Sequence, residues 1–195
     1  MKFPIVVFTA LLALASACAM AQTPSPSPTQ AYQRSNKHER VRRYVNSMFG
    51  YSTIGKNLAG AGISTWTNSP EDWGTHWDGF GKRFASNMGK GVIKNTTAFG
   101  LEEALKFDSR YVPAPKKGIG YRIGNALISP FVARNKHGHR VFGLPRVAGT
   151  YTAHVIAAET WYPDRYTWRD GLRSGTISLG TSAIFNLFKE FSHRK

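Results

Sequence analysis

Large apolar residues recur at helical spacing through the middle of the chain. Six of them follow one another at intervals of three or four residues: Trp73, Trp77, Phe80, Phe84, Met88 and Val92. This spacing gives an α-helix one apolar face over several turns. Ser69, Pro70 and Asp72 are residue types that begin helices. We therefore predict a helix from 70 to about 106, with a bend near Gly89–Gly91.

Four other segments have the same spacing and complete the predicted fold. They are 37–48, 118–133, 145–161 and 167–192. We expect Pro130 to bend or end the second of these helices, and Thr167 with Asp170 to cap the last. The glycine-rich stretch 50–62 fits no single class. The sequence predicts a mainly α fold, a small bundle of four to six glycine-containing helices.

The second and fourth of these helices carry apolar faces of the kind that packs on neighbouring helices. The residues in register are Ile119, Ile123 and Leu127 in one helix, and Ile177, Ile184, Leu187, Phe188 and Phe191 in the other.

Small residues also fall on single helix faces. They are Gly81, Ala85, Gly89, Gly120, Gly124, Gly171 and Gly175. Glycine costs nearly 1 kcal/mol relative to alanine inside a helix, so its repetition indicates that helix backbones approach closely. This pattern is typical of helices packed in membranes and also occurs in tight soluble bundles. After residue 21, no segment has the length and apolarity of a conventional transmembrane helix, which favours peripheral association or a soluble bundle.

The N-terminal region reads as a secretory signal peptide. Residues 1–21 contain Lys2, a short apolar run and an Ala19–Ala21 cleavage motif. Lipidation at Cys18 is the alternative, although the Leu usual three residues earlier is missing. We predict a Pro/Ser-rich linker at 22–35 and a single helical domain at 36–195.

The chain is strongly basic, with a formal net charge of +15. Such a charge favours anionic partners at long range. For an exported protein we expect anionic lipid, lipopolysaccharide or other envelope components, and no nucleic acid. The cations that we expect to contact a membrane or anion are Lys37, Arg40, Arg42, Arg43, Lys116, Lys117, Arg134, Lys136 and Arg140.

Sequence motifs for catalysis are missing from the chain. It has no HExxH, CxxCH, G-x-S-x-G or Walker-type motif. The pair His137 and His139 lies in a cationic loop, which repels metal ions. We predict no metal, no cofactor and no catalytic residue. A soluble periplasmic enzyme that uses Asp108, Glu159 and His154 stays open as the alternative.

Alternating residues at 118–124 leave a second architecture open. Ile119, Tyr121 and Ile123 alternate with glycines and Arg122, as in strands of an outer-membrane β-barrel. The alternation is local, whereas the helical spacing at 73–92 is long, so we favour the bundle.

Three segments resemble an uncharacterised group of small exported envelope proteins of Gram-negative bacteria. They are Phe107–Tyr111, Trp161–Arg165 and Leu179–Phe191, and the similarity covers roughly residues 70 to 191. The resemblance implies export and no particular activity. Together with the charge and the aromatic content, it leads us to expect a non-enzymatic envelope protein held near an anionic membrane surface or envelope polymer.

Overall fold

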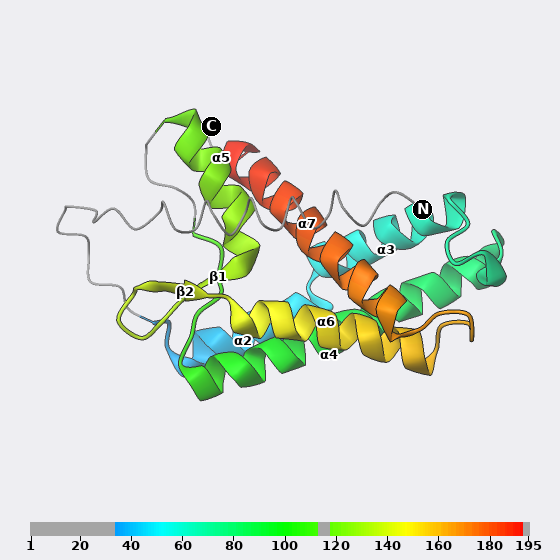
Figure 1. Ribbon diagram of the computed structural model, residues 1–195, viewed down its shortest axis with the longest axis horizontal. Coiled ribbons are helices and arrows are strands. Elements are labelled where there is room, and N and C mark those ends of the chain that lie inside the picture. The colour runs from blue at the N-terminus through cyan, green and yellow to red at the C-terminus, as the bar shows by residue number, and fades with distance from the viewer. Residues whose placement is uncertain (1–33, 113–117, 193–195) are drawn as a thin grey trace. The chain divides into compact units, whose positions relative to one another are not determined.

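Three other helices pack along one long helix, α4 (Trp77–Leu105). The computed structural model describes residues 34–112 and 118–192, all of which belong to one compact unit (Figure 1). The described residues are mainly helical, which confirms the predicted fold class. The other helices are α2 (Lys37–Phe49), α3 (Tyr51–Trp66), α5 (Ile119–Ile128), α6 (Leu144–Thr160) and α7 (Trp168–Ser192).

The α4 helix begins seven residues later than the sequence predicts. Residues 71–73 form a 3-10 turn instead, and the Ser69 side chain caps no helix. The cause is Arg83, only 2% exposed, whose guanidinium donates to the carbonyls of Ser69, Pro70 and Gly74 at 2.9, 2.6 and 2.5 Å. These bonds hold the preceding loop outside the helix. The helix then runs without interruption through the predicted bend at Gly89–Gly91.

The ambiguous glycine-rich stretch is helix α3, which packs on the first half of α4. The Asn57 amide nitrogen donates to the Met88 sulfur at 2.9 Å. The α2 helix packs on the second half, where the Tyr44 ring stacks on Phe99 with centroids 4.6 Å apart. Both helices therefore lie along α4.

The helices α4, α6 and α7 meet at glycines. A Cβ added at Gly149 of α6 would lie 2.5 Å from the Lys94 carbonyl oxygen of α4. At Gly171 of α7 it would lie 2.7 Å from the Val155 Cα of α6, and at Gly175 it would lie 2.8 Å from the Tyr151 ring. These distances are too short for any larger residue, so glycine permits the close crossing.

The interior consists mainly of small residues, and many large apolar side chains are exposed. The buried apolar residues are Met48, Ala61, Ala126, Ala133, Ala153, Ala157, Ala158, Leu179 and Ala183. By contrast, Trp77 is 86% exposed and Phe188 is 68% exposed. None of the described helices is long and apolar enough to span a membrane.

The predicted apolar faces of α5 and α7 are therefore wrong as packing faces. On α5, the stripe Ile119, Ile123 and Leu127 is exposed, while Arg122 and Ala126 on the other side are buried. On α7, exposed residues include Ile177, Ile184, Phe188 and Phe191, and buried ones include Gly171, Gly175, Leu179 and Ala183. Small residues occupy the inner face because the helix axes lie too close for large ones.

A buried ion pair joins α5 to α7. The Arg122 Nε donates to Glu190 Oε1 at 3.0 Å, and its Nη2 donates to the Glu190 carbonyl oxygen. The Tyr111 hydroxyl donates to the second carboxylate oxygen of Glu190. Burial and the Glu190 carboxylate raise the pKa of Tyr111 well above its usual value, so its hydroxyl stays protonated.

The predicted helix 118–133 ends at Ile128, and a hairpin follows it. Pro130 lies in a 3-10 turn, after which β1 (Val132–Arg134) pairs antiparallel with β2 (Arg140–Phe142). Asp108 forms an isolated bridge with Arg134 and so ties the segment after α4 to this hairpin. The Thr167 backbone N–H donates to the Asp170 carboxylate at 3.0 Å, as the predicted cap requires.

Several predicted features lie outside the described residues. They are the signal peptide 1–21, Cys18, most of the linker 22–35, and Lys116 and Lys117. The end of the predicted linker is packed on the domain, because the Arg34 guanidinium donates to the Glu102 carbonyl oxygen and the Glu103 carboxylate, each at 3.0 Å.

Candidate anion-binding cleft

A cationic cleft of about 250 Å³ lies between α2, the second half of α4 and the start of α6. Its charged lining comprises five cations and two carboxylates: Arg40, Arg43, Lys94, Arg110, Arg146, Glu102 and Asp108. Tyr44, Ser47, Asn95 and Ser109 add polar groups to the wall. The cleft can therefore offer many hydrogen-bond donors to an anion.

The two carboxylates of the cleft already have partners within the protein. Asp108, which is buried, forms an ion pair with Arg110 at 3.3 Å. Glu102 accepts from the Ser109 backbone N–H at 3.2 Å. Burial raises the pKa of Glu102. Neither carboxylate is paired with Lys94 or Arg43 in the described structure.

Lys94 is a half-buried cation that lines this cleft. Its ammonium group makes no hydrogen bond or ion pair with residues 34–112 or 118–192. Burial, and secondarily the like charge of Arg146, lowers the pKa of Lys94 to about 8. At neutral pH the group is thus still charged, at a free-energy cost to the fold.

Arg146 lies in the first turn of α6 and is held by carbonyl groups. Its guanidinium donates to the carbonyl oxygens of Ser109 and Ser129. Burial lowers its pKa, while Glu102 and Asp108 raise it. The carbonyl bonds fix its position but do not neutralise its charge.

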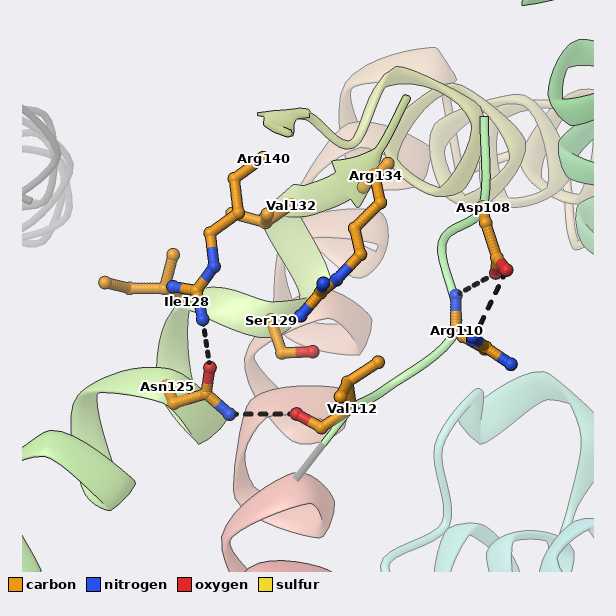
Figure 2. Close-up of a pocket in the computed structure, with 10 residues that line it drawn as sticks. Asp108, Arg110, Val112, Asn125, Ile128, Ser129, Val132, Arg134 and Arg140 are labelled. Carbon is orange, nitrogen blue, oxygen red and sulfur yellow. Dashed lines mark hydrogen bonds and ion pairs between the residues drawn. The ribbon is translucent and has the colours of Figure 1, made fainter. Parts of the chain in front are cut away.

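A second, much smaller hollow of about 30 Å³ lies on the other side of Asp108 and Arg110 (Figure 2). Figure 2 shows that the Arg140 side chain extends from the hairpin to Asn125, and its Nη2 donates a hydrogen bond to the Asn125 Oδ1 at 2.8 Å. The Asn125 nitrogen in turn donates to the Val112 carbonyl oxygen at 3.1 Å. This volume is enough for a water molecule or two but not for a lipid headgroup.

The predicted cationic residues are divided among different surroundings. Lys37, Arg42 and Arg43 are exposed on α2, whereas Arg40 of the same helix is half-buried and pairs with Glu103 at 2.6 Å. Lys136 is exposed at the hairpin turn. Arg134 and Arg140 line the small hollow, and of the predicted cations that the structure describes, Arg40 and Arg43 line the cleft.

The residues of the enzyme alternative do not share a cavity. Asp108 lines the cleft, while His154 lines a separate hollow with Tyr162 and Asp170. Glu159 is exposed on α6. Among the described residues, no group of three or more His, Cys, Asp and Glu side chains is arranged to hold a metal ion.

Exposed aromatic residues gather at the opposite end of α4. Trp66 and Trp77 are 87% and 86% exposed and line an apolar hollow with Phe80. Trp73 packs edge-on against Tyr162, with ring centroids 5.1 Å apart. The Trp161 indole N–H donates to the Ser86 hydroxyl at 2.9 Å.

The predicted small-residue stripes hold helices together at some positions and not at others. Gly171 and Gly175 lie at the close crossing of α6 and α7. A Cβ added at Gly89 would lie 3.6 Å from the Trp161 ring, an ordinary van der Waals contact. At Gly81, Gly120 and Gly124 an added Cβ meets nothing within 4 Å in the described structure, so these glycines lie at no close contact there. Ala85 is exposed beside Trp161 in an apolar hollow.

Sequence reasoning missed Lys94, Arg146 and Gly149. Lys94 is one of several cations along α4, and nothing in its local sequence distinguishes it from Lys82 or Lys90. The close approach at Gly149 depends on a neighbour more than fifty residues away in the chain.

Neither a protein-family model, nor a curated protein, nor a solved structure matches this chain. The resemblance to exported envelope proteins thus remains a prediction from the three sequence segments.

Proposed function

We propose that this protein is a non-enzymatic component of the bacterial cell envelope that lies against an anionic membrane surface. The contact is made by the outer face of α2 and α3, here called the docking face. Its exposed apolar residues are Val41, Val45, Phe49, Tyr51, Leu58, Ile63 and Trp66. The observation that carries the proposal is this row of apolar side chains with exposed cations among them.

The two helices of the docking face both pack along α4 and also contact each other. On α2, Val41, Val45 and Phe49 are spaced four residues apart and form one stripe. Tyr51, 96% exposed, continues it at the start of α3. Large apolar side chains that face outward in a row indicate a surface that is covered in use.

The positive charge of the docking face favours an anionic membrane as its partner. Lys37 and Arg42 are exposed on α2 and Lys56 is exposed on α3, and Glu39 is the single acidic residue between 37 and 66. A helix with an apolar stripe and flanking cations lies in the interface of a membrane that contains anionic lipids. Aromatic residues such as Tyr51 and Trp66 suit the headgroup region because their rings have both apolar and polar parts.

Co-sedimentation of the full chain with lipid vesicles tests this function. We expect binding to phosphatidylcholine vesicles that contain phosphatidylglycerol, and weaker binding to phosphatidylcholine alone. A cation near such a surface contributes about 1 kcal/mol, so R42Q lowers partitioning about fivefold and high salt lowers it further. The double variant V45S/F49S lowers it by about tenfold, because two apolar groups no longer insert.

Two controls locate the contact. N46S changes an exposed residue of the same helix outside the apolar stripe and leaves binding unchanged. I184S removes an exposed apolar residue of α7, away from the docking face, and also leaves binding unchanged. If I184S weakens binding while V45S/F49S does not, the proposed face is wrong. Equal binding to both kinds of vesicle rejects an anionic surface as the partner.

A further inference from the structure

We propose that the cleft between α2, α4 and α6 binds a phosphate monoester, with Lys94 and Arg43 as its direct ligands. The inference concerns a different surface from the docking face. It rests on the cleft alone and does not require that the protein bind a membrane.

The first argument is the charge left over inside the cleft. The two lining carboxylates are engaged by Arg110 and by the Ser109 N–H, and Arg40 is paired with Glu103 outside the lining. Lys94 and Arg43 make no ion pair within the described structure. The like charge of Arg146 acts on Lys94, and a doubly charged anion in the cleft would offset that repulsion.

The second argument is the position of Lys94. A lysine side chain is flexible and normally extends to water, yet this one is half-buried beside Arg146. Burial lowers its pKa to about 8, so the group is still protonated at neutral pH and can donate three hydrogen bonds. The fold thus keeps a desolvated donor in the wall of the cleft, where hydrogen bonds to a bound anion would replace those lost to water.

The third argument is the size and chemistry of the wall. A volume of about 250 Å³ is just below the usual range for drug-sized ligands, roughly 300–1,000 Å³. It fits a phosphate group with a small organic substituent. Arginine at the rim gives planar paired donors that match phosphate oxygens. The Asn95 amide donates to the Ser47 carbonyl oxygen at 3.1 Å and so has a second N–H left for a ligand.

A phosphate monoester can come from a soluble metabolite or from a lipid headgroup. The chemistry recognised in the cleft is the same for both, and the two sources are separated by experiment. We therefore use glycerol 3-phosphate as the soluble probe, and vesicles of phosphatidylcholine that contain phosphatidic acid as the membrane probe.

Isothermal titration calorimetry of the full chain with glycerol 3-phosphate tests the proposal. We expect saturable binding by the wild type, and an affinity about tenfold lower in K94M, because a charge-assisted hydrogen bond is lost. R43Q also weakens binding. The matched control is R42Q, which removes the same charge from the adjacent residue outside the cleft and changes the affinity less than about twofold. Circular dichroism verifies that each variant is folded.

The outcomes either support or reject the cleft as a phosphate site. No saturable binding by the wild type, or equal losses in R42Q and R43Q, overturns the proposal, since the effect would then be one of general charge. Where K94M also weakens binding to phosphatidic acid vesicles, the ligand is a headgroup; where it does not, the ligand is soluble. Failure of the docking face appears instead as unchanged vesicle binding in V45S/F49S, so the two proposals fail separately.

Discussion

The two ends of α4 hold cations in opposite ways. Around its first turns lie Trp66, Trp73, Trp77 and Trp161, and there the guanidinium of Arg83 is enclosed and bonded to three carbonyl oxygens. Around its second half lies the cleft, where Lys94 has no such partner in the described structure. We call these regions the tryptophan end and the arginine end. A cation whose bonds are complete supports the fold, whereas one without partners is available to a ligand.

The acidic residues accentuate this difference. Glu71 and Asp72 lie at the tryptophan end, where Arg165 approaches them at 3.7 and 2.9 Å. The charges there are largely balanced within the protein. The arginine end retains an excess of cations around a cavity, so an anion approaching the protein is drawn toward it.

The largest predicted effect concerns Arg83. R83M leaves the carbonyl oxygens of Ser69, Pro70 and Gly74 without a donor, and we expect a loss of about 3 kcal/mol in unfolding free energy. Urea denaturation followed by circular dichroism measures it. The control K82M removes an exposed cation that pairs with Asp78 at 2.7 Å and should cost less than about 0.5 kcal/mol. A small effect of R83M would remove the structural role assigned to this end.

The second effect concerns the close crossing of α6 and α7 at Gly171. G171A places a methyl group against the Val155 backbone, and we expect about 2 kcal/mol of destabilisation. G180A lies on the same helix, where an added Cβ meets nothing within 4 Å in the described structure, and should stabilise the protein by up to about 1 kcal/mol. Opposite signs in denaturation experiments confirm which face of α7 is packed; equal signs contradict it.

The third effect concerns His154 of α6, whose pKa is lowered mainly by burial. Burial, followed by the charges of Lys90 and Lys94, lowers the pKa of His154 from 6.5 to about 4. Between these values the unfolded chain binds a proton that the folded chain does not, so the unfolding free energy falls as the pH falls from 6.5 to 4. We expect a loss on the order of 2 kcal/mol, complete near pH 4.

Comparison of the wild type with H154Q isolates this contribution from that of the carboxyl groups. The variant should lose less stability between pH 7 and about pH 4.5 than the wild type does. Identical pH profiles would mean that His154 titrates normally in the folded protein.

The smallest predicted effect is an increase in the unfolding free energy, whereas R83M is expected to lower it. K94M replaces a half-buried charge beside Arg146 with an apolar chain of similar length, and should raise the unfolding free energy by about 1 kcal/mol. Thermal denaturation in phosphate-free buffer measures it. A destabilised K94M would indicate that Lys94 supports the fold, and the contrast between the two ends would disappear.

The helical class and most helix positions follow from spacing along the chain. The pattern around Trp73–Val92 and the cap formed by Thr167 and Asp170 are local features, and local features can be recognised in sequence. The start of α4 could not be predicted in this way. Arg83, in the second turn of α4, donates to the carbonyl oxygens of Ser69 and Pro70 and so keeps these residues outside the helix. The short hairpin was missed because Val132–Arg134 is too brief to show alternation.

The direction of the helix faces was the main error. Periodicity shows that Ile177, Ile184 and Phe188 share a face, but not whether that face is inside. The usual assumption places large apolar residues in the core. Here the helices cross at glycines, and the same faces lie outside. The cleft could not be predicted from the sequence for a similar reason. Arg43, Lys94 and Arg146 lie on three different helices and come together only when these helices pack.

An interior of alanine and glycine has a thermal consequence. Ala153, Ala157 and their neighbours have no side-chain rotamers to lose on folding, and Phe188 and Tyr51 keep theirs because they remain outside. Unfolding in water therefore exposes little additional hydrocarbon, and its heat capacity increment per residue should fall below the usual value of about 12–15 cal/mol/K. The stability curve of such a protein is shallow, so its melting is broad and its resistance to cold is unusually good.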